Sequence, residues 1–135
     1  MALQLSDAVR NARVNAIETT IGTAAVLKIR TGAQPATVAT ADSGTVLASL
    51  TLPSDWMAAA SSGAKALSGT WSDTSANGTG TAAHFRIYES TATTCHIQGS
   101  VTATGGGGDL TLDNTSIASG QAVSITSFTL TDGNA

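Results

Sequence analysis

The sequence predicts a mainly β protein, an antiparallel β-sandwich or jelly roll of seven to eight strands with one N-terminal α-helix. After residue 22, apolar residues alternate with a period of two, as on strands that bury one face. These runs are short and are separated by polar, glycine-rich turns, which favours a sandwich over βαβ units. Before residue 22 the apolar spacing is helical. We therefore divide the chain into an N-terminal helix at 1–22 and a β-sandwich domain at 23–135.

The helix is predicted from its caps and its spacing. Ser6 is a suitable N-cap, Asp7 lies in the first turn, and Gly22 suits the position after the last turn. A modest apolar stripe, widened by Ile17 and Ile21, is formed by Leu5, Val9, Ala12, Ala16 and Thr20. A helix with so weak a stripe persists only when docked, so we expect it to pack on its own sandwich or to act as a docking arm for a neighbouring subunit.

Strands are predicted at 26–30, 45–52, 65–73, 84–88, 94–103, 110–112 and 123–130. Gly69 marks a bulge inside 65–73, and residues 53–57 are expected to form a turn that leads into one helical turn. Residues 89–93 suit a hairpin, and the four glycines at 105–108 predict a very flexible connection. In 84–88, Phe85 and Ile87 share one face, while His84, Arg86 and Tyr88 share the other.

Composition limits the function classes. Charged residues make up 11% of the chain, against about 25% in an average soluble domain. Two compatible interpretations are a Thr- and Ser-rich solvent face and a surface that becomes an interface. The net charge is −3 and the six Lys and Arg residues are scattered, so we expect no nucleic-acid partner. No apolar run reaches the roughly 20 residues of a membrane span, and the first residues lack a secretory pattern, so we expect no membrane partner.

No residue cluster has the spacing that a known chemistry requires. The glycine run at 105–108 lacks the Lys-Ser/Thr pair of a phosphate loop. Cys95 and His96 point to opposite faces of a strand, and His84 is the only other histidine. We therefore expect no catalytic residues, no metal and no cofactor, and no enzymatic activity. A small hydrolase that uses His84 or His96 is the weakest of the functions considered.

Three segments, at residues 1–32, 47–63 and 80–101, resemble small structural proteins of tailed phages and prophages. The first begins MALQLSDAVRNAR, the second contains TLPSDWMAAASSG and the third AAHFRIYESTATTCHIQG. The resemblance suggests similarity to capsid cement (decoration) proteins and transfers no functional residues. It implies binding to the major capsid protein lattice on the outer surface of the virion, as a homodimer or homotrimer made in the cytoplasm of the host bacterium. An acidic, lysine-poor chain suits that surface better than packaged DNA.

We expect function to reside in interfaces. The candidate contact residues are Leu5, Val9, Arg10, Arg13 and Tyr88. Deletion of residues 1–21 is expected to abolish particle binding and to leave a folded β domain. The alternative function is a tail or head-fibre component that binds host glycans through exposed rings, for which the candidates are Trp56, Trp71 and Tyr88.

Overall fold

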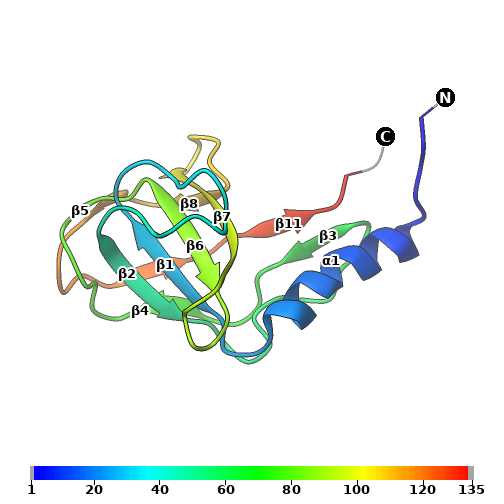
Figure 1. Ribbon diagram of the computed structural model, residues 1–135, viewed down its shortest axis with the longest axis horizontal. Helices are drawn as coiled ribbons and strands as arrows, with labels where there is room; N and C mark the ends of the chain where they lie inside the picture. Colours follow the sequence, from blue (N-terminus) through cyan, green and yellow to red (C-terminus); the bar gives the residue numbers. More distant parts are fainter. Residues whose placement is uncertain (1, 134–135) are drawn as a thin grey trace.

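The computed structural model describes residues 2–133 and confirms a mainly β chain with one N-terminal helix (Figure 1). The largest sheet has five strands in the order β2-β1-β6-β7-β8. Their bounds are β1 (Val26–Arg30), β2 (Val46–Thr51), β6 (His84–Tyr88), β7 (Cys95–Ala103) and β8 (Leu110–Leu112). The hairpin predicted at 89–93 joins β6 to β7, and the Glu89 carboxylate accepts hydrogen bonds from the backbone N–H groups of Thr93 and Thr94.

Helix α1 (Asp7–Ile21) begins and ends where its caps predict. The Ser6 hydroxyl accepts a hydrogen bond from Val9 N at 3.3 Å. Gly22 has φ = +89°, and its N–H donates to the Glu18 carbonyl. The side of the helix that faces the protein differs from the predicted stripe. Its fully buried residues are Val14 and Ile21, with Ile17 packed partly against the core.

Two predicted strands are each broken into two. The run 65–73 becomes β3 (Ala64–Ala66) and β4 (Trp71–Asp73), and 123–130 becomes β10 (Val123–Ile125) and β11 (Thr129–Thr131). The halves pair as β3 with β11 and β4 with β10, both antiparallel. The register moves by one residue between the two ladders. Gly69, the predicted bulge, lies in this gap with φ = +73°.

Three further predictions are wrong. The pair β7–β8 is parallel, because the chain turns back through residues 104–109 before β8 begins. Within the turn at 105–108, Gly108 N donates to Thr102 Oγ1 at 2.9 Å, and the predicted flexibility of this connection stays a prediction. No helical turn forms at 53–57; Met57 pairs instead with Leu67 in an antiparallel bridge. The described chain has eleven strands rather than seven or eight, because two predicted strands divide and because β5 (Gly80–Thr81) and β9 (Ser116–Ile117), each of two residues, are too short to show alternation.

A core of large rings lies between the five-stranded sheet and the β4–β10 ladder. Trp71 contacts Trp56 and Phe128 at ring-centroid distances of 6.0 and 5.5 Å, and Phe128 meets Phe85 of β6 edge-on at 5.6 Å. Away from this core, α1, β3 and the end of β11 extend together from the body, with both termini at that end (Figure 1). We call this extension, α1 with β3 and β11, the arm.

Candidate interaction surface

Polar side chains hold α1 in place, together with the buried Val14 and Ile21. Residues 11, 15 and 18 lie on one face of the helix, and each accepts a hydrogen bond from a backbone N–H group of the segment before β3. The acceptor and donor pairs are Asn11 Oδ1 with Gly63 N (2.8 Å), Asn15 Oδ1 with Ala60 N (3.3 Å), and Glu18 Oε1 with Met57 N (3.0 Å). The donor residues 57, 60 and 63 are spaced three apart, and they run antiparallel to the helix. The helix side chains therefore satisfy backbone N–H groups that a neighbouring strand would otherwise bind.

Lys65 on β3 is 4% exposed and completes this contact. Its ammonium group lies 2.8 Å from Glu18 Oε2 and donates to Asn15 Oδ1 at 2.9 Å and to the Ala58 carbonyl at 2.8 Å. The buried charge is therefore neutralised by Glu18 and donates two hydrogen bonds to the chain, which is the condition for placing a lysine inside a protein. The spacing of polar residues 11, 15 and 18 on one helix face is the signal that could have predicted this contact.

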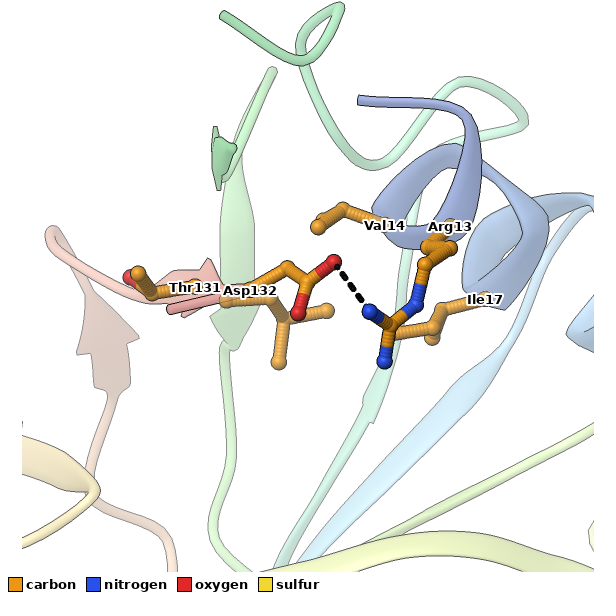
Figure 2. Close-up of a pocket in the computed structure, with 6 residues that line it drawn as sticks. Arg13, Val14, Ile17, Thr131 and Asp132 are labelled. Atoms are coloured by element: carbon orange, nitrogen blue, oxygen red, sulfur yellow. Dashed lines mark ion pairs between the residues drawn. The ribbon is translucent and has the colours of Figure 1, made fainter. Parts of the chain in front are cut away.

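The first turns of α1 are tied to the end of β11. Arg10 Nε donates to the Asp132 carbonyl at 3.0 Å, and its guanidinium also pairs with Asp7 at 3.0 Å. Arg13 forms an ion pair with Asp132 at 3.2 Å, across a hollow that Figure 2 shows between α1 and β11. The pair lacks hydrogen-bond alignment, since Asp132 Oδ2 has no hydrogen-bond donor. With Arg13 58% exposed, we expect the pair to contribute little to stability.

The predicted contact residues do not share one surface. Val9 is 46% exposed and Arg13 is exposed, whereas Leu5 is half-buried and Arg10 is mostly covered by its own chain. Tyr88 is only 2% exposed, so its prediction as a contact residue is wrong. It lies on the face of β6 that we expected to be open, but the segment 31–45 covers that face.

Removing the helix is also expected to do more than we predicted, because Ile21 belongs to the core and Trp56 Nε1 donates to the Gly22 carbonyl at 3.0 Å. Lys65 would lose two of its three partners in addition. We therefore expect deletion of residues 1–21 to destabilise the β domain, and point substitutions on the exposed side of α1 are the better probe.

Three connected hollows are bordered by α1, β11 and β7. The first, of about 230 Å³, lies between Val14 and Ile17 of α1 and Leu130 of β11. The second, of about 280 Å³, shares Arg13 and Ile17 with the first and reaches His96 of β7. The third, of about 240 Å³, shares Leu130 and Thr131 with the first and separates β11 from Ile97 and Gln98 of β7. We call these three neighbouring hollows together the groove.

A separate polar cluster fixes the segment 31–45 over the outer face of the five-stranded sheet. Asp42 lies at its centre, and its carboxylate accepts hydrogen bonds from Arg30 Nη2 at 2.6 Å, Arg86 Nη1 at 2.5 Å and the Tyr88 hydroxyl at 2.7 Å. Arg86 is 1% exposed and donates further to the carbonyls of Thr40 and Val38. These bonds hold an otherwise irregular segment against β1 and β6 and account for the two buried arginines.

The charged groups of this cluster bind one another and have a structural role. Burial opposes ionisation of Asp42, but the Tyr88 hydroxyl and the two arginines outweigh it and lower the pKa of the carboxyl group. Burial, reinforced by the hydrogen bond to Asp42, raises the pKa of Tyr88 to about 12. Burial also raises the pKa of the Cys95 thiol, although the nearby Arg86 opposes this. The thiol is therefore held in its less reactive, protonated form.

The glycan-binding alternative loses its candidate residues, and the hydrolase alternative keeps only His96. Trp56, Trp71 and Tyr88 are each at most 2% exposed, so they offer no stacking platform for a glycan in this structure. His84 is fully buried, and its Nδ1 lies 2.9 Å from the Gly32 carbonyl, whereas His96 is exposed on β7. Within residues 2–133 no three His, Cys, Asp or Glu side chains gather as metal ligands. None of the described helices is long and apolar enough to cross a membrane.

No family model, curated protein or solved structure matches this chain.

Proposed function

We propose that this chain is a non-enzymatic structural protein of a tailed-phage virion that binds the outer capsid surface and stabilises contacts between capsomers. The likeness of residues 1–32, 47–63 and 80–101 to small virion proteins suggests the setting. The acidic, lysine-poor composition supports a surface away from packaged DNA. The protein would be made in the cytoplasm of the host bacterium and carried out as part of the particle.

One structural observation supports an interface role most directly. Part of the predicted stripe, formed by Val9, Ala12, Ala16 and Thr20, faces solvent, whereas Ile17 and Ile21 pack against the core. Val9 is 46% exposed, and Ala12, Ala16 and Thr20 are also exposed. This face lies on a helix that is fixed to β3 and β11, and its one charge, Arg13, is paired with Asp132, so binding to it would need little ordering of the chain and would bury no unpaired charge. Several copies bound to one lattice would convert weak contacts into firm retention.

We also propose that the sheets pack as a sandwich of the jelly-roll type. The ring contacts of Phe128 with Trp71 of β4 and with Phe85 of β6 support this, since they join the β4–β10 ladder to the five-stranded sheet. Two layers joined through such a core are the usual arrangement of small all-β domains.

The test is binding to capsids of the encoding phage that lack this chain. Val9→Asp is the variant of choice: it places a carboxylate in the first turn of α1, where the helix dipole favours it, so folding is preserved. Burial of one valine stabilises an interface by about 1.5 kcal/mol or more, so we expect capsid affinity to fall by about tenfold or more. Val38→Asp, at another exposed valine, is the matched control and should bind normally.

Two readouts decide the outcome: co-sedimentation with capsids and the temperature at which the capsids break open. The wild-type chain and Val38→Asp should bind and raise that temperature, and Val9→Asp should do neither. Capsids that are equally stable with and without the wild-type chain would contradict the proposal.

A further inference from the structure

The outer edge of β11 is an unpaired strand edge. Among the described residues, β11 pairs only with β3, on one of its two sides. Asp132 N donates to the Gly63 carbonyl, so residues 128, 130 and 132 bond toward β3. By alternation, the N–H and C=O groups of Thr129 and Thr131 point away from β3. These groups can therefore bind another strand.

Other strand edges of this protein are closed by its own chain. On the far side of β3, residues 58–61 bond to the backbone of Ala64 and Ala66. On β2, the Leu47 carbonyl accepts a hydrogen bond from Asn77 N at 2.8 Å. Open edges are usually guarded by a charged residue or a proline, but residues 127–131 contain neither. Within residues 2–133, the outer edge of β11 thus has neither a covering segment nor a guarding residue.

The sequence of β11 suits pairing with a second copy of itself. A threonine lies on each side of Leu130, so the strand is symmetric about this residue. When two copies run antiparallel about a two-fold axis at Leu130, each Thr129 lies opposite the partner's Thr131. All the outward N–H and C=O groups then bond, and the two Leu130 side chains lie side by side. A shift of two residues would leave a threonine opposite a residue outside β11.

Helix α1 and the groove extend this contact beyond the strand edge. Leu130 and Lys65 are partners in the β3–β11 ladder, and Lys65 binds Glu18, so α1 lies over the face that carries Leu130. Two paired copies therefore form a four-stranded sheet with both helices on one face. A stable dimer buries about 800 Å² per partner, more than a three-residue edge supplies. The side of α1 along the groove, with Arg13 and Ile17, adds to that area.

The charges and the shape of the arm also suit a second copy. Arg13 and Asp132, which line the first hollow, form an ion pair, so the contact buries no net charge there. The Asp132 residues of the two copies lie four positions apart along the strands, about 14 Å, beyond the screening length of about 8 Å in physiological salt. Because β11 runs outward from the body (Figure 1), antiparallel pairing places the two bodies at opposite ends of the joined sheet.

We propose that two copies of this chain pair through the outer edges of β11, antiparallel and in the register that places Leu130 beside the partner's Leu130. The joined arms form one four-stranded sheet, which the two α1 helices cover on one face. Each copy contributes the same surface, so the assembly closes as a dimer. The inference concerns the isolated chain and does not depend on the proposed capsid role.

Charge substitutions at the two exposed threonines test both the pairing and its register. In Thr129→Lys/Thr131→Lys, each lysine faces a lysine of the other copy, whereas in Thr129→Lys/Thr131→Glu each lysine faces a glutamate. Neither variant touches the core, because both side chains are exposed. In analytical ultracentrifugation over a concentration series, we expect the wild type and the Lys/Glu variant to dimerise. The dimer dissociation constant of the Lys/Lys variant should be about tenfold higher or more.

Thr131→Pro is an independent probe of the same edge. It removes an N–H group that points to the partner and no hydrogen bond toward β3, and proline is tolerated on strand edges. We expect it to raise the dimer dissociation constant by about tenfold or more. Amide hydrogen exchange locates the contact: the N–H groups of Thr129 and Thr131 should exchange slowly in the wild-type dimer.

Three results would overturn the proposal. The first is a wild type that stays monomeric at every concentration. The second is a Lys/Lys variant that dimerises as tightly as the Lys/Glu variant, which would exclude this register. The third is a dimer in which the N–H groups of Thr129 and Thr131 exchange as fast as in the monomer, which would place the contact on another surface.

Discussion

Lys65 should be the more critical of the two lysines for stability. Lys65→Met keeps most of the buried volume and removes the ammonium group that binds Glu18, Asn15 and the Ala58 carbonyl. Loss of one partner of a buried ion pair costs about 3 to 5 kcal/mol, and Glu18, at 16% exposure, retains some water and its bond to Met57. We expect the free energy of unfolding to fall by about 3 kcal/mol and the Tm by about 10 °C.

Urea denaturation followed by the fluorescence of Trp56 and Trp71 measures this loss. Lys28→Met is the matched control, because Lys28 is half-buried and its ammonium group lies over the Tyr88 ring, 5.2 Å from the centroid. It should cost about 1 kcal/mol or less. In a double-mutant cycle, Glu18→Gln together with Lys65→Met should cost less than the two single changes added, by about 1 kcal/mol or more. Equal losses for the two lysines, or additive changes in the cycle, would refute the polar docking of α1.

Three other outcomes are expected. Because the pKa of Asp42 is lowered by folding, its carboxylate stabilises the protein above the unfolded pKa of about 3.9, and this stabilisation is lost as the pH falls through the folded pKa. Asp42→Asn should therefore lower the Tm at pH 6, and the Tm of this variant should fall less steeply in acid than that of the wild type. Tyr88, the single tyrosine, should resist ionisation up to about pH 12 in an ultraviolet titration. Its contribution to stability should decline as the pH rises above the pKa of an unfolded tyrosine, about 10. Ionisation near pH 10 in the folded protein would contradict its burial. Gly106→Ala would place a Cβ 2.8 Å from the Thr102 side chain and should cost about 1 to 3 kcal/mol in urea denaturation, whereas Gly133→Ala, with open space around it, should be neutral.

Local rules were sufficient for the parts of the fold that local residues determine. The caps Ser6 and Gly22 gave the ends of α1, and alternation gave most of the five-stranded sheet. These rules failed where contacts between distant segments determine the strand pairing or the burial of a face. The backbone of residues 104–109 returns beside β7 and makes a parallel pair, which no spacing within one strand indicates. The 31–45 segment covers Tyr88, so alternation on β6 could not distinguish an exposed face from a covered one.

The contacts of α1 with its own chain differ from those that we predicted, and its role as an interaction surface stays a prediction. We expected α1 to dock through an apolar stripe, but Asn11, Asn15 and Glu18 dock it, because backbone donors of residues 57–63 need acceptors. Val9, Ala12, Ala16 and Thr20 therefore face outward, while Ile17 and Ile21 of the same predicted stripe pack against the core.

A reconstruction of the encoding phage particle by electron cryo-microscopy tests the proposed function most directly. We expect density for this chain on the outer capsid surface, bridging neighbouring capsomers, with the outward face of α1, including Val9, against the lattice. Density for the chain along the tail, inside the capsid, or nowhere in the particle would contradict that proposal.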